Sequence, residues 1–229
     1  MNLHVWLHLE RIIQNQYLQI RTFECKQLRE WVDFALESGS LIIFDAAYES
    51  YIHDIALPHS IFEIVGAKKC AVEVCSFSKM AGFTGVRCGW CAISRALPLH
   101  PLWKRRQSTK FNGASYISQR GALAALSPPG VEENQKSIDY YMKNAHLLAD
   151  FCKRKGISFF GGENAPYIWA KQPEGVDAWE FFNYVLKHAQ VVITPGIGFG
   201  SAGAGYFRLS SFATEGDVLT AIKRLNRVL

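Results

Sequence analysis

The sequence predicts an α/β fold, and three observations lead to this prediction. Short apolar runs of strand length, such as LIIF at residues 41–44, are followed at once by polar residues. Longer stretches place apolar residues at helical spacing, as in residues 28–36. The composition is that of an ordinary globular protein, with 49% hydrophobic and 20% charged residues, and 229 residues suffice for one large domain or two small ones.

In the first half of the chain, the sequence pattern predicts a helix, then three strands, then a second helical segment. The apolar spacing within residues 28–36 indicates a helix that ends at Gly39, since glycine terminates helices without strain. The continuous apolar run at residues 41–44 is typical of a strand buried on both faces of a parallel sheet. Further strands are predicted at residues 71–76 (AVEVCS) and 87–94 (RCGWCAIS), and a largely helical segment at residues 102–126.

The second half begins after a break in the pattern. Pro128, Pro129 and Gly130 interrupt the periodicity, and we place a domain boundary there. A long amphipathic helix ending near Gly156 is expected next. Thr214 and the acidic residue three positions later form a capping signature for a final helix. Between these helices the sequence predicts strands at residues 166–170, 191–194 and 206–212 and a helix at residues 176–188.

Charge and hydropathy exclude several classes of protein. The net charge of +5 comes from basic residues spread along the chain, so solvated faces are a better interpretation than a nucleic-acid interface. No apolar run approaches the ~20 residues that span a bilayer, and no charged leader followed by an apolar run opens the chain. We therefore expect a cytoplasmic protein with neither nucleic-acid nor membrane partners.

The cysteines and histidines indicate neither a disulfide framework nor a metal site. Six cysteines lie at spacings that match no stapled small domain. Cys88 and Cys91 have the C-x-x-C spacing, but they fall in a predicted strand, where this offset points their side chains to opposite faces. His4 and His8 have the spacing of helical metal ligands without a third ligand near them. We expect structural thiols and no metal.

Chemically useful side chains follow two consecutive predicted strands. Ligands of open α/β sheets bind outside the carboxyl ends of the strands, so side chains placed there are expected to share a site. These side chains are Asp45 and Tyr48 after the first strand, and Ser76, Ser78, Lys79 and Arg87 after the second. A single lysine among apolar residues and glycines suits covalent chemistry, because partial desolvation keeps its amine neutral and nucleophilic. This set of residues matches the needs of pyridoxal phosphate, whose ring nitrogen requires a carboxylate and whose phosphate requires hydroxyls and a guanidinium.

The stretch SFSKMAGFTGVRCGW, residues 76–90, resembles the cofactor-lysine motif of fold-type I aminotransferases, which depend on pyridoxal 5'-phosphate. More narrowly, several blocks are similar to the LL-diaminopimelate aminotransferase family. They are FDAAYESYI, SIFEI, FNGASYISQRGALAAL, GGENAPYIW, TPGIGFG and FRLSSF. The resemblance implies a partial cofactor-binding large domain with a truncated sheet at residues 24–128 and a small α+β domain at residues 129–229. Residues 1–23 resemble nothing in the family.

The resemblance also implies a role for each matching residue. Lys79 would attach the cofactor and carry the proton during catalysis, Asp45 would pair with the pyridinium, and Tyr48 would hydrogen-bond the ring oxygen. The phosphate would be held by Ser76, Ser78 and Arg87. Substrate binding would fall to Arg208, as a bidentate clamp on the α-carboxylate, and to Asn112, which in such homodimers reaches across from the neighbouring subunit.

The activity implied is amino-group transfer between LL-diaminopimelate and 2-oxoglutarate, in lysine and peptidoglycan precursor synthesis. The family's Asn-Pro-x-Gly strand end is absent, since no asparagine here is followed by proline. Family members are also considerably longer, so the chain looks truncated at its N-terminal side. Two alternatives stay open: another enzyme of the same fold, such as an aromatic or alanine aminotransferase or a C–S lyase, and a non-catalytic remnant.

Overall fold

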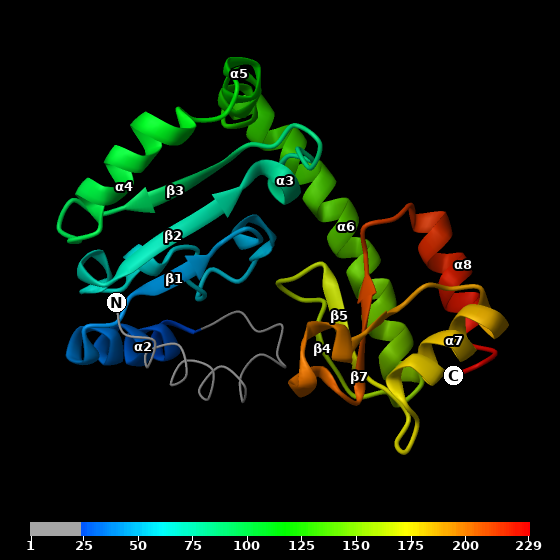
Figure 1. The fold of residues 1–229 in the computed structure, drawn as a ribbon. Helices are drawn as coiled ribbons and strands as arrows, with labels where there is room; N and C mark the ends of the chain where they lie inside the picture. The colour runs from blue at the N-terminus through cyan, green and yellow to red at the C-terminus, as the bar shows by residue number, and fades with distance from the viewer. Residues whose placement is uncertain (1–23) are drawn as a thin grey trace. The chain divides into compact units, whose positions relative to one another are not determined.

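The computed structural model describes residues 24–229, which form two compact units that divide within one long helix (Figure 1). The first unit ends at Ile138 and the second begins at Asp139. The helix, α6 (Pro128–Arg154), starts at the Pro-Pro-Gly segment, because proline at a first helical position gives up only an N–H that has no helical partner. The sequence places a domain boundary after residue 128, whereas the compact units divide further along α6.

The first unit contains a three-stranded sheet in the order β1 (Ile42–Asp45), β2 (Ala71–Ser76) and β3 (Gly89–Ile93). β1 and β2 are parallel, with Asp45 opposite Val74, and β3 is antiparallel to β2. The three predicted strands of this half are confirmed, and the parallel pair has the arrangement on which the predicted site depends.

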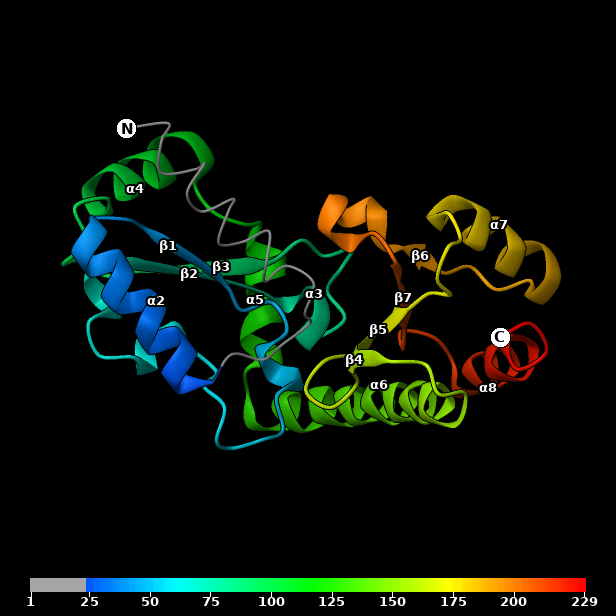
Figure 2. The same ribbon diagram turned by 90° about the horizontal axis from the view of Figure 1, so that it is seen from below.

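Helix α2 (Cys25–Ser38) covers one face of this sheet. Its buried residues Leu28, Val32 and Ala35 share a core with Ile42 and Phe44 of β1. The helix ends at Gly39, whose φ of 67° confirms the predicted left-handed terminator. Figure 2 shows α2 and α4 (His100–Arg106) on opposite sides of the sheet.

The expectation that β1 is buried on both faces is wrong. Its residues alternate between half-buried and exposed, and the side chain of Ile43 is 64% exposed. The physical reason is that α2 covers only the face that carries Ile42 and Phe44. An apolar run in the sequence records which faces a strand can bury, and the neighbouring elements decide which faces it does bury.

The segment predicted to be largely helical at residues 102–126 is interrupted. After α4 the chain forms one π-helical turn, Gln107–Phe111, and Asn112 ends it with a φ of 59°. Helix α5 (Tyr116–Ala125) starts after Ser115, whose hydroxyl accepts the N–H of Ser118. Left-handed residues such as Asn112 end helices, and asparagine tolerates this conformation better than most residues.

The second unit packs helices against a four-stranded antiparallel sheet. The strand order is β4 (Phe159–Gly161), β5 (Tyr167–Lys171), β7 (Tyr206–Ser210) and β6 (Thr194–Pro195). Helices α6, α7 (Ala178–Ala189) and α8 (Glu215–Leu225) supply apolar residues to a common core around Phe151, Ile168 and Phe207.

Most predicted elements of the second unit are confirmed. Thr214 caps α8 by accepting the N–H of Asp217 at 3.1 Å. The strand predicted at residues 191–194 is wrong in extent, because pairing with β7 begins only at Thr194. Strand β4 was not predicted, because its three residues are too few to show a period.

The predicted absence of a metal site and of a membrane span can be compared with the described residues only. Within residues 24–229, no cluster of His, Cys, Asp or Glu is suited to hold a metal ion. His4 and His8 lie outside the described residues. None of the helices described is both long and apolar enough to cross a membrane.

Candidate active site

The carboxyl ends of β1 and β2 bring the first predicted site residues to one edge of the sheet. The strands run parallel and end at Asp45 and Ser76 respectively. A short helix, α3 (Phe77–Met80), begins directly after β2 and carries Ser78 and Lys79. The shared direction of the two strands is therefore what gathers residues that are more than thirty positions apart in sequence.

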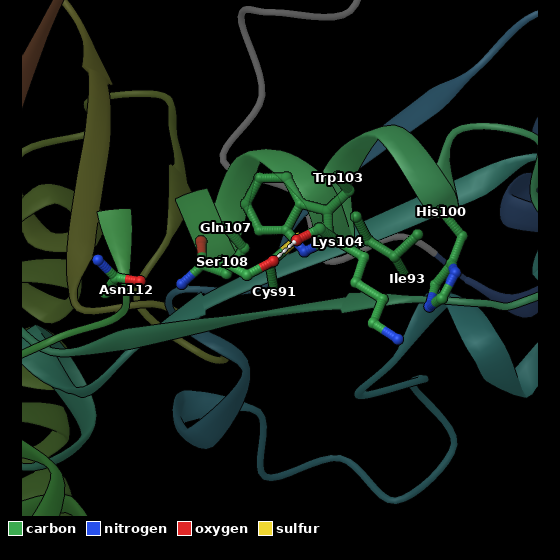
Figure 3. Close-up of a pocket in the computed structure, with 8 residues that line it drawn as sticks. All are labelled: Cys91, Ile93, His100, Trp103, Lys104, Gln107, Ser108 and Asn112. Carbon is green, nitrogen blue, oxygen red and sulfur yellow. Dashed lines mark hydrogen bonds between the residues drawn. The ribbon is translucent and has the colours of Figure 1, made fainter. Parts of the chain in front are cut away.

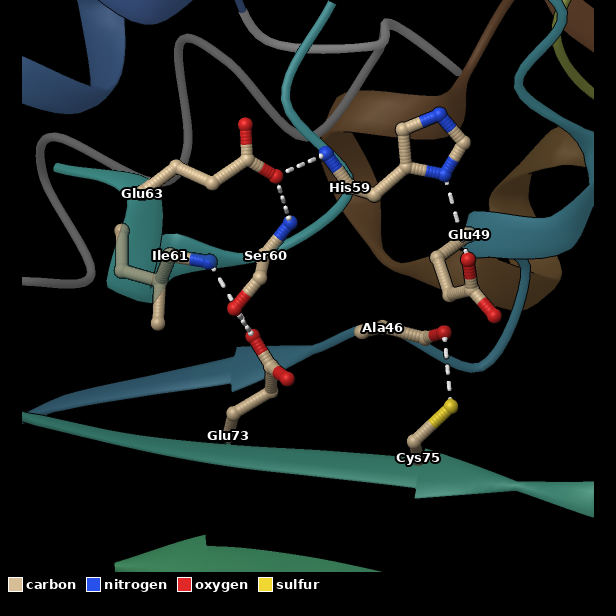
Figure 4. A network of polar contacts seen from close by, with 8 residues as sticks. All are labelled: Ala46, Glu49, His59, Ser60, Ile61, Glu63, Glu73 and Cys75. Carbon is tan, nitrogen blue, oxygen red and sulfur yellow. Dashed lines mark hydrogen bonds and ion pairs between the residues drawn. The ribbon is translucent and has the colours of Figure 1, made fainter. Parts of the chain in front are cut away.

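Hydrogen bonds hold the loop after β1 against β2. Asp45 accepts the N–H of Ala47 on Oδ1 at 3.0 Å, and the N–H of Ala46 donates to the carbonyl of Val74 at 2.8 Å. The Cys75 thiol donates to the carbonyl of Ala46 at 3.2 Å (Figure 4). One carboxylate oxygen of Asp45 thus stabilises the turn that follows β1. Its exposed side chain keeps Oδ2 available to an incoming cation.

Tyr51 supports Lys79, and sequence reasoning did not single it out. Its side chain is fully buried and its hydroxyl donates to the backbone carbonyl of Lys79 at 3.1 Å. The centre of its ring lies 6.2 Å from that of Tyr48. The sequence feature that could have indicated Tyr51 is its position in DAAYESY, three residues after Tyr48.

Residues 76–87 form a loop closed by its own hydrogen bonds. Ser76 caps α3 by accepting the N–H of Ser78 at 3.1 Å. The hydroxyl of Thr84 donates to the carbonyl of Ser78 at 3.1 Å, and Nη1 of Arg87 donates to the carbonyl of Thr84 at 2.9 Å. The chain of contacts joins the three predicted phosphate-binding residues Ser76, Ser78 and Arg87 through Thr84.

The donors in this loop fit a phosphate group. Two hydroxyls, a guanidinium and the N–H groups that open α3 are all donors to an anion. Arg87 has a φ of 61°, a conformation that is uncommon in arginine and that the bond to Thr84 helps to hold. Gly89 lets the strands meet here, since a Cβ would lie 2.7 Å from the carbonyl oxygen of Cys75. The residues present therefore fit the phosphate of a pyridoxal cofactor.

A second hydrogen-bond network connects β2 to the segment of residues 59–63 (Figure 4). The carboxylate of Glu73 is buried, and its Oε2 accepts the hydroxyl of Ser60 at 2.6 Å and the N–H of Ile61 at 3.0 Å. Glu63 accepts the N–H groups of His59 and Ser60. These bonds tie residues 59–63 to the strand that ends at Ser76. The sequence feature that could have indicated this network is the single glutamate within the apolar strand AVEVCS.

Arg208 belongs to the second unit, where aromatic rings flank its guanidinium. The guanidinium carbon lies 4.5 Å from the ring centre of Tyr167 and 4.8 Å from that of Phe199, distances typical of cation–π contacts. Its Nε is buried and has no hydrogen-bond partner among the described residues. A buried guanidinium N–H without a partner costs free energy, so this arginine is suited to take a carboxylate.

Asn112 lies at the end of the π-helical turn and lines a pocket of about 570 Å³ beside β3 (Figure 3). The pocket is bounded by Cys91 and Ile93 of β3 and by residues of α4 and the turn that follows it. None of the predicted cofactor-binding residues lines it. Cys88 and Cys91 are free thiols, in agreement with the structural interpretation of the C-x-x-C spacing.

The parallel strand pair ends in an aspartate and in a donor-rich loop around a lysine, which is the arrangement that the sequence predicts for a pyridoxal-phosphate site. The chain matches the family described as aminotransferase class I and II over residues 21–225. It belongs to that family.

Individual relatives within the family differ in how similar they are to this chain. The chain is 50% identical over 213 residues to the LL-diaminopimelate aminotransferase of Bacteroides fragilis, covering 89% of this chain and 52% of the relative. The solved LL-diaminopimelate aminotransferase of Chlamydomonas reinhardtii superposes with a TM-score of 0.88 at 42% identity, over 92% of this chain and 53% of that one. An aromatic aminotransferase from Pyrococcus horikoshii is more distant, with a TM-score of 0.81, 27% identity, and coverage of 90% and 55%. The chain spans about half the length of the relatives it matches.

Proposed function

We propose that this chain forms part of a pyridoxal-phosphate-dependent aminotransferase that exchanges an amino group between LL-diaminopimelate and 2-oxoglutarate. The observation that carries the proposal is the position of Lys79, at the end of β2 and inside the loop that Ser76, Thr84 and Arg87 close by hydrogen bonds. The substrate rests on the comparisons, since identity to the diaminopimelate enzyme is 50% and identity to the aromatic aminotransferase is 27%.

Pyridoxal phosphate, when bound, supplies an aldehyde for covalent attachment and a ring that accepts electrons. Ser76, Ser78 and Arg87 would bind its phosphate, and the Asp45 carboxylate would hold a proton on its ring nitrogen. Lys79 provides the amine, and the bond from Tyr51 to the Lys79 carbonyl orients the backbone from which that amine extends.

Arg208 contributes the recognition of an acid substrate. Its flanking rings, Tyr167 and Phe199, limit the directions the guanidinium can take, and its buried Nε gains a partner when a carboxylate binds. Amino acids and 2-oxo acids share this carboxylate. The arginine thus accounts for binding of both substrates of a transamination.

The attachment of the cofactor can be tested directly. The chain is mixed with pyridoxal phosphate, reduced with borohydride, and digested for peptide mapping. The label is expected on Lys79, and Lys79→Arg is expected to remove it while leaving the far-ultraviolet circular dichroism unchanged. A label spread evenly over surface lysines, or equal labelling of the variant, would remove Lys79 from the proposed role.

A further inference from the structure

Two buried N–H groups of the second unit have no hydrogen-bond partner, and they belong to residues that face each other across neighbouring strands. Among the described residues, the buried side-chain polar atoms without a partner are Ser50 Oγ, Asn144 Oδ1, Trp169 Nε1, Gln172 Oε1, Arg208 Nε and Ser211 Oγ. Only the atoms of Trp169 and Arg208 are N–H groups, which donate and cannot accept. A buried donor without an acceptor destabilises a fold, so both groups indicate an acceptor from outside the described chain.

The pairing of the sheet places these two donors on one face. Trp169 of β5 is directly opposite Arg208 of β7. Side chains at opposite positions of an antiparallel pair share a face, with Cβ atoms about 4.5–5.5 Å apart. The Trp169 side chain is buried, and its ring stacks on the ring of Tyr206 at a distance of 5.9 Å between centres. The sheet and this stacking therefore hold the indole beside the guanidinium.

The positive charge at this position is not balanced by a carboxylate. None of the ion pairs among the described residues includes Arg208. The rings of Tyr167 and Phe199 flank the guanidinium, and aromatic faces attract a cation without neutralising it. A bound carboxylate supplies what both donors lack, because it carries a negative charge and accepts hydrogen bonds on two oxygens.

Phe199 contacts both of the residues that carry the donors. Its ring centre lies 5.4 Å from that of Trp169 and 4.8 Å from the guanidinium carbon of Arg208. The side chain is 51% exposed, and its two neighbours in the chain, Gly198 and Gly200, have open space around their Cα atoms. Glycines on both sides let the backbone change direction at little steric cost. Phe199 can therefore turn away from the donors without uncovering the core.

We propose that Trp169 is a second hydrogen-bond donor at the carboxylate site of Arg208. The carboxylate of an amino acid or a 2-oxo acid accepts the indole N–H as well as the guanidinium N–H groups, and Phe199 turns aside to admit it. The inference rests on the proposed function, in which Arg208 binds the substrate carboxylate, and it adds a residue to that site. Donors on two neighbouring strands fix the orientation of the carboxylate, and orientation is what a transferred group requires.

Nuclear magnetic resonance observes both donors directly. The 229-residue chain, labelled with a nitrogen isotope, is titrated with 2-oxoglutarate in the absence of cofactor. The indole signal of Trp169 is identified as the one that Trp169→Phe lacks. We expect this signal and the Nε–H signal of Arg208 to shift along one binding curve. Trp169→Phe should weaken binding about tenfold, because hydrogen bonds to charged groups are the stronger ones. The matched control is Trp179→Phe, at an exposed position of α7, which should bind as the unchanged chain does.

The outcomes separate this inference from the proposed function. A shift of the Arg208 signal without one of Trp169, or equal binding by Trp169→Phe, would overturn the second donor and leave Arg208 as the clamp. If neither signal shifts, the inference and the proposed role of Arg208 are both wrong, while the labelling of Lys79 still tests cofactor attachment by itself. The other indole signals should stay dispersed in Trp169→Phe. If they collapse, the titration of the unchanged chain decides.

Discussion

At the scale of single residues, the Glu73 side chain ties β2 to the segment that contains Ser60 and Ile61. Its Oε2 is the acceptor for both the Ser60 hydroxyl and the Ile61 N–H, in a buried position. Glu73→Ala removes the acceptor of the buried Ile61 N–H and of the half-buried Ser60 hydroxyl, which costs about 1–3 kcal/mol. Glu73→Gln keeps an acceptor and should cost less. Urea unfolding measures the loss of stability in both variants, from the shift of the midpoint where the m-value is unchanged. Equal midpoints for the two variants would show that the bonds do not matter.

The buried thiol of Cys75 makes stability depend on alkaline pH. Burial is the main cause that raises the pKa of Cys75 to about 12, from 9.0 for an unperturbed thiol, and nearby carboxylates raise the pKa further. A group that keeps its proton longer in the folded state stabilises that state fully below pH 9. This stabilisation falls by up to about 1.4 kcal/mol per pH unit as the pH rises toward 12.

Cys75→Ser isolates this effect, because a serine hydroxyl donates to the Ala46 carbonyl as the thiol does and does not ionise in this range. We expect the urea midpoint of the unchanged chain to fall more steeply between pH 9 and pH 11 than that of Cys75→Ser. The difference between the two curves cancels the titration of tyrosines and lysines. Parallel curves would mean that Cys75 ionises as it does in the unfolded chain.

At the scale of elements, the two faces of β1 are expected to respond differently to the same substitution. Ile42 packs against α2 and Ile43 is 64% exposed. Ile43→Thr should change stability by less than about 0.5 kcal/mol and slow aggregation, since it removes exposed apolar surface from an edge strand. Ile42→Thr should cost roughly 1–3 kcal/mol. Thermal unfolding and light scattering check both, and a reversed order of stability would contradict the face assignment.

The elements that could be predicted are those specified by local sequence. Gly39 ends α2 and Thr214 starts α8, because the conformation or the hydroxyl that each position requires lies in that residue. The exposure of Ile43 and the interruption at Asn112 could not be predicted, since both depend on which elements lie next to the segment. In the site, the positions of Asp45 and Ser76 at strand ends could be predicted from the apolar runs that precede them. The roles of Tyr51 and Glu73 could not, because their partners are distant in sequence.

At the scale of the whole molecule, the predicted site residues are divided between the two units. Lys79, Asp45 and the phosphate-binding loop belong to the first unit, and Arg208 belongs to the second. Each group is fixed by contacts within its own unit, such as the rings around Arg208 and the bond from Tyr51 to Lys79. Cofactor attachment and carboxylate recognition can therefore be measured separately before any turnover is sought.

Turnover makes stricter demands than either of these functions. Reacting groups must be held in register, and a displacement of ~1 Å can cost about a hundredfold in rate. The 229-residue chain covers 52% of the diaminopimelate enzyme to which it is 50% identical, and the outer edge of β3 has no strand beside it in the described sheet. Assayed alone with LL-diaminopimelate and 2-oxoglutarate, the chain should therefore be at least about a hundredfold slower than that relative.

Co-expression with the part of the Bacteroides fragilis enzyme that lies outside the match should raise this rate. The assay follows glutamate formation, and a Lys79→Arg chain in the same complex sets the background. If the complex forms and turnover stays at that background, the proposed activity is wrong. If the 229-residue chain alone matches the rate of the relative, the expected dependence of turnover on the other half of the relative's length is wrong.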